Sequence, residues 1–259
     1  MKHIVLIFSL VIIFLMMVVM IINHQEKPPM RLLSTQKYYS YLYEDEKQMQ
    51  VVLYINDLTH PIVNQESYES INLSNLDQTK NLEMTLNKVT LDSEEVYLNE
   101  TYMQMTLFME IPNLNQDFQI EDLYLEIHLV NEDAYFISLG SLSLIYTLSN
   151  SDYLDWTALD GLKNASFFIS RLGEVTIEYQ TLDQEIEKIL IGYNYEAEFS
   201  IYPDSLVLTI PFENLLLDEI PVIIYFQSGH VQTIANFRYM FNYQILKESG
   251  LLINTYALN

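Results

Sequence analysis

The feature that most constrains the fold of this chain is a two-residue alternation of apolar and polar side chains. Between 101 and 111, methionine, leucine and isoleucine occupy the odd positions, opposite tyrosine, glutamine, threonine, phenylalanine and glutamate. The same alternation recurs over 82–87, 123–129 and 174–179. Successive side chains of a strand point to opposite faces, so the pattern predicts antiparallel strands with one buried and one wet face.

Turn residues divide the chain into many short strands. Gly140, Gly173 and Gly229 each separate two apolar runs and are predicted to form hairpin turns. Other expected strands cover 50–55, 134–138, 142–147, 189–201, 206–210, 222–227 and 237–246. This arrangement favours a mainly β fold, a sandwich or barrel, over alternating βαβ units.

One stretch departs from the alternation. Ser149 and Asp152 match a helix capping box, Leu154, Ala158 and Leu162 follow at helical spacing, and a glycine at 161 could end the helix. We therefore expect a linker with a short helix at 149–162. It would separate one β-sandwich at 36–148 from a second at 163–259.

A short stretch carries a family resemblance. An alternating strand at Tyr102–Ile111 ends in the polar turn Pro112-Asn113-Leu114-Asn115, and a second strand follows at Ile120–Leu129. This stretch resembles the membrane-anchored immunoglobulin-like ectodomains of Gram-positive bacteria. The resemblance implies an immunoglobulin-like sandwich and an envelope location, although the chain lacks a cysteine for lipid attachment.

The N-terminal segment predicts a membrane anchor. Residues 4–22 are uncharged, with Ser9 the only polar residue, and a helix of this length spans the hydrocarbon core. A secretory signal peptide has a shorter apolar region followed by a small-residue cleavage site, which is missing here. We therefore expect a retained transmembrane helix at 4–22, a cytoplasmic stub at 1–3 and a tether at 23–35.

The orientation of this anchor has two readings. Lys27, Arg31 and Lys37 follow the apolar segment, whereas Lys2 precedes it, and that balance of positive charge favours a cytoplasmic body. Long domains translocate largely regardless of charge, however, and so short a stub favours export of the rest of the chain. We expect a single-pass protein of the cell membrane with most of its chain extracytoplasmic.

The charge of the chain restricts its partners. Its net charge is −23, with 12 basic and 35 acidic residues. A nucleic-acid-binding surface needs clustered lysine and arginine, so nucleic acid is excluded. An envelope protein, a glycan or a divalent cation would be more compatible partners. High net charge also keeps a chain rich in tyrosine and leucine soluble without any partner.

Motifs for catalysis, cofactors or metals do not stand out. The chain has no cysteine, and its five histidines are scattered without an H-E-x-x-H pattern. Ser34-Thr35-Gln36-Lys37 matches S-x-x-K by letter but lies in the expected tether. No catalytic, cofactor-binding or metal-ligating residue is therefore assigned.

Carboxylates are so plentiful that residue type alone does not exclude a catalytic acid–base pair. Glycoside hydrolysis needs two of them flanking a sugar, which spacing in sequence cannot establish. The clusters are Glu94 with Glu95, Asp152 with Asp155, Asp183 with Glu185 and Glu187, and Asp218 with Glu219.

Aromatic side chains are the remaining candidates for binding. Tyr39, Tyr41 and Tyr43 would share one face of a strand, and Trp156 is the only tryptophan. Exposed rings of this kind stack on sugars or anchor a protein partner, although the same residues also pack well in sheets. Two functions follow: a non-enzymatic binding or structural module of the cell envelope, or an anchored hydrolase of envelope polymers using paired carboxylates.

Overall fold

The computed structural model describes residues 29–42, 48–146, 151–163, 171–210, 216–217, 219–239, 244–248 and 252–258. Residues from Arg31 onward form one compact unit. The predicted anchor at 4–22, most of the predicted tether and Tyr43 lie outside the described residues. Within the described ranges, no helix is both long and apolar enough to cross a membrane.

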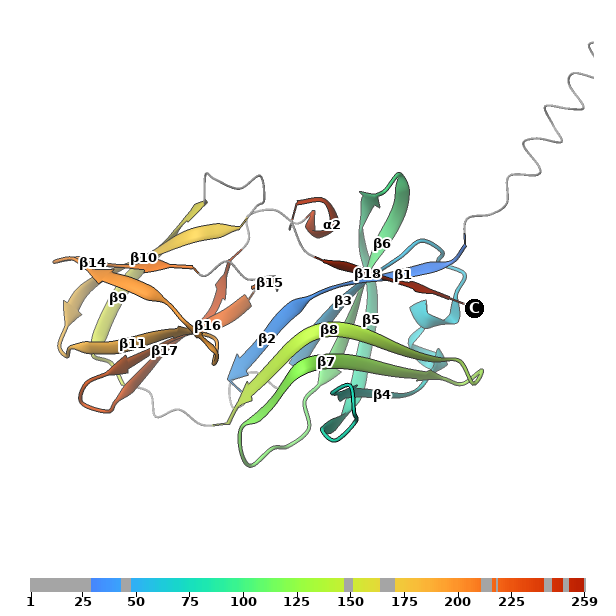
Figure 1. Ribbon diagram of the computed structural model, residues 1–259, viewed down its shortest axis with the longest axis horizontal. Coiled ribbons are helices and arrows are strands. Elements are labelled where there is room, and N and C mark those ends of the chain that lie inside the picture. Colours follow the sequence, from blue (N-terminus) through green and yellow to red (C-terminus); the bar gives the residue numbers. More distant parts are fainter. Residues whose placement is uncertain are drawn as a thin grey trace, which may run out of the picture. The chain divides into compact units, whose positions relative to one another are not determined.

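The described body is mainly β, as the alternation predicts (Figure 1). Most apolar positions of the predicted strands are buried, including Leu123, Leu125, Ile127 and Leu129, and Val175, Ile177 and Tyr179. The strands of the first half are β1 (Arg31–Thr35), β2 (Lys37–Leu42), β3 (Gln48–Ile55), β4 (Tyr68–Ser74), β5 (Asn81–Tyr97), β6 (Glu100–Glu110), β7 (Phe118–Leu129) and β8 (Ala134–Ile145).

These strands form a ten-stranded sheet in the order β15-β2-β8-β7-β4-β5-β6-β3-β1-β18. The short β15 (Leu216–Leu217) and β18 (Ile253–Ala257) come from later in the chain. The 17-residue β5 pairs first with β4 and then with β6, so it belongs to both layers of a sandwich. If β1, β3, β4, β5, β6, β7 and β8 are lettered A to G in chain order, β5-β6-β3-β1 is D-E-B-A and β4-β7-β8 is C-F-G. This is the strand order of an immunoglobulin-like sandwich.

The first strand differs from the sequence prediction. The stretch 31–35, expected to be the end of the tether, is β1, which pairs with β3 on one side and β18 on the other. Leu32 and Leu33 are fully buried. The tether prediction is therefore wrong for these residues, because pairing on both edges and burial of the two adjacent leucines hold them in the sheet.

Two of the three predicted glycine turns are also wrong. Gly140 lies inside β8 with a φ of +118°, where an added Cβ would lie 2.2 Å from the Lys37 carbonyl oxygen. Glycine is needed there because β2 joins β8 as a parallel neighbour at this point. Gly173 lies inside β10, whereas Gly229 does form the turn between β16 and β17, with a φ of +80°.

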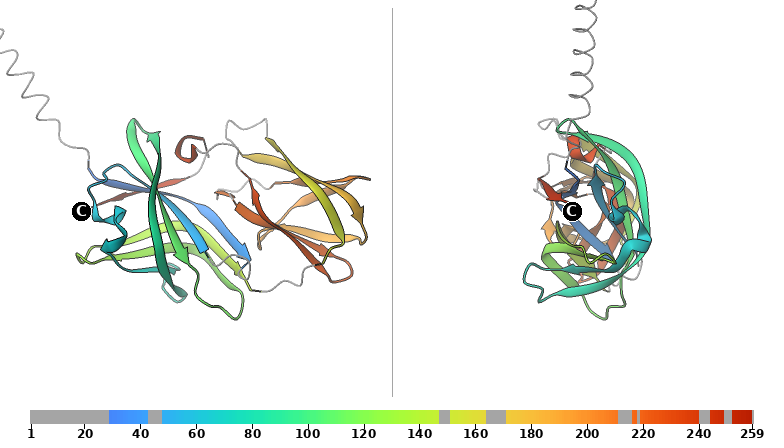
Figure 2. Two further views of the ribbon diagram at one scale, coloured as in Figure 1. Left: turned by 180° about the vertical axis from the view of Figure 1, so that it is seen from behind. Right: turned by 90° about the vertical axis from the view of Figure 1, so that its right-hand side faces the viewer.

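The second half forms two four-stranded sheets, in the orders β13-β14-β10-β9 and β12-β11-β16-β17. Figure 2 shows these strands as two layers from a second direction. If β9, β10, β11, β12, β13, β14, β16 and β17 are lettered A, B, C, C′, D, E, F and G, the two sheets have the orders D-E-B-A and C′-C-F-G. This order is again immunoglobulin-like. The strands are β9 (Leu154–Lys163), β10 (Leu172–Leu182), β11 (Ile186–Ile191), β12 (Tyr195–Glu196), β13 (Glu198–Ile201), β14 (Ser205–Thr209), β16 (Glu219–Phe226) and β17 (Val231–Arg238).

The helix predicted at 149–162 is wrong over its described part, because β9 occupies 154–163. Leu154, Ala158 and Leu162 do not share a buried face: the first is 1% exposed and the last is 63% exposed. Instead, β9 pairs antiparallel with β10 along its length. Pairing with a distant strand therefore overrides the local helical spacing.

The end of the chain returns to the first sheet. The helix α2 (Ile245–Glu248) packs Leu246 against Leu33, Tyr54 and Tyr102, and β18 then pairs with β1. The Glu95 carboxylate accepts hydrogen bonds from the Ile245 and Leu246 backbone N–H groups, at 3.1 and 2.9 Å. The ten-stranded sheet thus takes a strand from the segment that the sequence assigned to the second sandwich.

Candidate functional site

The predicted aromatic residues are placed differently from one another. Tyr39 is only 2% exposed within β2, so its ring packs in the interior and is not available for surface stacking. Tyr41 is half-buried on the same strand, and Tyr43 lies outside the described residues. Trp156, by contrast, is 42% exposed on β9. The structure therefore separates Trp156 from the tyrosines with which it was grouped.

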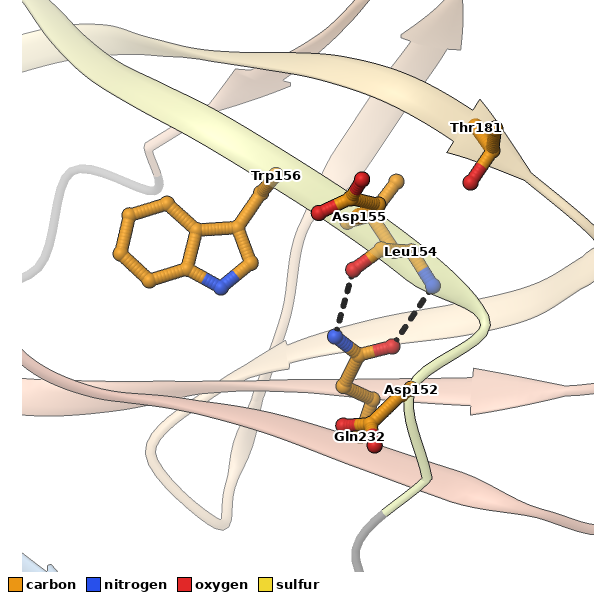
Figure 3. A pocket seen from close by; sticks show the side chains of 6 residues that line it. All are labelled: Asp152, Leu154, Asp155, Trp156, Thr181 and Gln232. Carbon is orange, nitrogen blue, oxygen red and sulfur yellow. Dashed lines mark hydrogen bonds between the residues drawn. The ribbon is translucent and has the colours of Figure 1, made fainter.

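Local irregularity of the β9–β10 pair sets the position of Trp156. Trp156 pairs with Tyr179, and the register shifts on both sides of Tyr179, between Glu178 and Tyr179 and again before Thr181. Such irregularities redirect side chains that a regular strand would point elsewhere. In Figure 3 the indole ring projects from β9, with its nitrogen on the side of the Gln232 amide.

The ring stands beside a cavity of about 420 Å³. This volume lies within the range that suits a small ligand. The lining comes from three strands and the segment before β9: Asp152, Leu154, Asp155, Trp156, Thr181 and Gln232. Asp152 and Asp155, paired in the sequence analysis, therefore meet the same cavity as the exposed tryptophan.

Gln232 holds one wall of the cavity in place. Its Oε1 accepts a hydrogen bond of 2.8 Å from the Leu154 N–H, and its Nε2 donates one of 2.7 Å to the Leu154 carbonyl oxygen (Figure 3). Both residues are buried. The Ser151 N–H also donates to the Val231 carbonyl oxygen at 2.8 Å, so β17 fixes the start of β9 at two points.

The remaining polar groups of the cavity face solvent. Asp152, Asp155 and Thr181 are exposed, and with the indole N–H they provide both acceptors and donors. An aromatic face beside hydroxyl and carboxylate groups can hold the C–H face of a sugar while accepting hydrogen bonds from its hydroxyls. The arrangement is suited to binding a polar, uncharged or cationic ligand.

Two other carboxylates hold parts of the fold together. Glu95 is bonded to the start of α2, and the buried Glu126 accepts hydrogen bonds from Ser74 and Gln78 at 2.6 and 2.9 Å. Asp218 lies outside the described residues. Among the residues that the structure does describe, no three histidine or acidic side chains are grouped closely enough to hold a metal ion.

Thr181 and Gln232 were missed by sequence reasoning. Gln232 lies 78 positions from Leu154 in the chain, and a glutamine in a strand carries no local sign that it bonds a distant backbone. Only the pairing of β9 with β10, and the packing of β17 against the start of β9, brings them together. Contacts between strands so far apart in the chain leave no pattern in the spacing of residues along the sequence.

No known protein family matches this chain, and no curated protein matches it either. Similar solved structures include SGBP-B of the Bacteroides ovatus mixed-linkage glucan utilization locus, in complex with a mixed-linkage heptasaccharide. That match has 11% identity and a TM-score of 0.22, covering 79% of this chain and 46% of that one. This chain therefore spans less than half of that protein's length.

Two further structures are similar at the same level. The fibronectin(III)-like modules of Clostridium thermocellum CbhA match with 10% identity and a TM-score of 0.20, covering 78% of this chain and 87% of theirs. The complex of Dpr2 Ig1-Ig2 with DIP-Theta Ig1-Ig3 matches with 8% identity and a TM-score of 0.20, covering 80% and 97%.

Proposed function

We propose that this chain is a single-pass, membrane-anchored extracytoplasmic protein whose sandwich body binds a glycan without transforming it. The observation that carries the proposal is the exposed Trp156 beside a cavity that also receives Asp152 and Asp155. The anchor is the apolar segment 4–22. The proposal therefore joins a membrane position inferred from sequence with a binding site inferred from geometry.

The chemistry of the site selects the class of glycan. Two carboxylates border the cavity, and the whole chain carries a net charge of −23. Both features repel anionic polymers, so the expected ligand is a neutral glycan or one with amino groups. The apolar C–H face of a pyranose would lie on the indole, and its hydroxyls would donate to the carboxylates.

Binding to a panel of immobilised polysaccharides tests the proposal. The full chain in detergent should bind a neutral glycan, and Trp156→Ala should weaken that binding at least about tenfold, the equivalent of about 1.4 kcal/mol. Tyr202→Ala is the matched control, because Tyr202 is 51% exposed on the same sandwich but lines no part of the cavity. Equal binding by the two variants would remove Trp156 from the site.

The meeting of Asp152 and Asp155 at one cavity also favours a second candidate, a hydrolase that cleaves the bound glycan. Both carboxylates are exposed, whereas a general acid is usually placed in an apolar pocket that keeps it protonated. Analysis of the glycan after incubation distinguishes the two functions. Recovery of intact polymer supports binding alone, and release of fragments that stops in Asp155→Asn supports the hydrolase.

The membrane position has its own test. Protease added to intact cells should remove the sandwich body, because that body is proposed to lie outside the cytoplasm. A body that becomes sensitive only after lysis would contradict the orientation. This result would leave the glycan measurement, which uses purified protein, unaffected.

A further inference from the structure

The hairpin between β5 and β6 ends in an unusually apolar tip. Val96 is 62% exposed and Leu98 is 79% exposed, and Tyr97 and Glu100 form the last pair before the turn. The two residues of the turn, Leu98 and Asn99, have φ values of 49° and 65°. This is the geometry of a type I′ turn, which favours asparagine or glycine at both positions.

Leucine is costly at the first position of such a turn. A positive φ brings its Cβ against the backbone, and the exposed side chain recovers no packing energy within the described body. A residue that is unfavourable for local folding and still highly exposed points to a role outside the fold. The tip is therefore a candidate contact surface.

The tip is fixed to the place where the chain enters the sandwich. The Arg31 Nη1 atom lies 2.8 Å from Glu100 Oε1, and the Tyr102 hydroxyl donates to Glu100 Oε2 at 2.8 Å. Arg31 is the first residue of β1. The apolar tip thus lies within side-chain reach of the first strand.

A second exposed leucine lies at the same end. The Arg31 N–H donates to Asn56 Oδ1 at 2.7 Å, and the Asn56 N–H donates to the Arg31 carbonyl oxygen at 3.3 Å. Leu58, two residues further on, is 45% exposed. Leu58, Val96 and Leu98 are here called the apolar end. Leu58 follows Asn56, which is bonded to Arg31, and Val96 and Leu98 lie at the tip of the hairpin whose Glu100 is paired with Arg31.

The length of chain before Arg31 indicates what covers the apolar end. Eight residues, 23–30, separate the predicted anchor from β1. Even fully extended, they span at most about 29 Å. Because the anchor holds its end at the bilayer surface, the end of the sandwich that carries Arg31 has to stay close to that surface.

We propose that the apolar end inserts its side chains into the interfacial region of the bilayer and so orients the sandwich body on the membrane. The inference rests on the membrane anchor of the proposed function and is independent of glycan binding. Burial of Leu98 and Val96 drives the contact, since no residue from 96 to 99 is basic. The exposed Glu94 and the net charge of −23 predict closer contact with zwitterionic than with anionic lipid.

Site-directed spin labelling tests the contact directly, because the chain has no cysteine of its own. The full chain carrying Leu98→Cys is labelled with a nitroxide and placed in phosphatidylcholine nanodiscs. Leu76→Cys is the matched control: Leu76 is 63% exposed in the turn that joins β4 to β5, before the opposite end of β5. We expect the ratio of oxygen to nickel-chelate collisions to be severalfold higher at position 98 than at 76.

Each outcome separates the inference from the function on which it rests. One outcome is a collision ratio that is equal and water-like at positions 98 and 76 while the chain stays in the disc through an alkaline carbonate wash. That result would overturn the membrane contact of the apolar end and leave the anchor intact. Loss of the chain from the disc overturns the anchor and the contact together. Strong dipolar broadening at position 98 would show a second copy of the chain on the tip, which also overturns the proposal.

A second variant distinguishes a membrane contact by Leu98 from a purely structural role in the turn. Leu98→Asn suits the turn better, so the unfolding temperature of the full chain should stay the same or rise. The same variant removes the apolar side chain, so a label at Leu58→Cys should become more accessible to the nickel chelate. Unchanged accessibility at position 58 would contradict the proposed insertion.

Discussion

The backbone N–H of Tyr193 donates a hydrogen bond of 2.8 Å to the phenolic oxygen of Tyr38, 155 positions earlier in the chain. Tyr38 belongs to β2 of the ten-stranded sheet but is fully buried in the hydrophobic core of the second sandwich. Its hydroxyl also donates to Ser143 Oγ at 3.2 Å. A Cβ on Gly192 would lie 2.4 Å from the Tyr38 ring, so a glycine permits this approach.

Removing this hydroxyl should destabilise the protein. Tyr38→Phe keeps the ring but deprives the Tyr193 N–H and the buried Ser143 hydroxyl of their partner, which costs about 1–3 kcal/mol. Urea unfolding and hydrogen exchange at the Tyr193 amide measure the effect. Tyr202→Phe, at an exposed tyrosine, should change neither. Unaltered protection at Tyr193 would show that the bond does not persist in solution.

The strand β1 should be essential to the body. A chain beginning at residue 36 lacks Leu32 and Leu33, both fully buried, and leaves β18 without its partner. Loss of the two leucines alone predicts a destabilisation of at least about 3 kcal/mol. Chemical denaturation followed by circular dichroism compares this chain with one beginning at residue 29. Identical midpoints would mean that β1 contributes little to the fold.

The cavity wall depends on both ends of the Gln232 amide. Gln232→Glu still accepts from the Leu154 N–H but cannot donate to the Leu154 carbonyl oxygen, and it places a carboxylate in a buried position. We expect a loss of about 1–3 kcal/mol in the free energy of unfolding and faster exchange of the Leu154 amide. Gln227→Glu, at an exposed glutamine close to the same strand, is the control. A stable Gln232→Glu variant would show that the second bond is dispensable.

Alkaline pH should weaken the fold through Tyr68. Burial raises the pKa of Tyr68, whose hydroxyl donates to the Ile62 carbonyl oxygen at 2.7 Å. Because the pKa of Tyr68 is higher in the folded than in the unfolded chain, the protonated hydroxyl stabilises the fold fully below the unfolded-state pKa of about 10. This stabilisation is lost as the pH rises above that value. Stability should therefore fall above pH 10, and less steeply in Tyr68→Phe. Parallel alkaline curves for the two proteins would contradict this assignment.

The pattern of apolar residues predicted the positions of most strands in the sequence, but not which strands pair with each other. The alternation over 101–111 and 123–129 was confirmed as β6 and β7, because side-chain period is a local property of the backbone. The helix at 149–162 was wrong because helical spacing and a capping box are weak local preferences. Pairing of β9 with β10 outweighs them over the whole of 154–163.

The candidate site was predictable only in part. Trp156 could be named as a candidate from its type, and Asp152 with Asp155 from their proximity in sequence, but the exposure of the indole ring is known only from the structure. The contributions of Thr181 and Gln232 were not predictable, since they reach the cavity from β10 and β17. The burial of Tyr39 was also missed, because alternation shows which residues share a face but not which face is covered.

By itself, the sequence determined that this chain forms strands, carries a strong negative charge and begins with a segment apolar enough to span a membrane. Those properties depend on each residue and its close neighbours. Only the tertiary structure decided that β18 completes the first sheet, that Tyr38 enters the second core and that Trp156 borders a cavity. These depend on contacts between residues far apart in the chain, which are selected by packing of the whole body rather than by local preference.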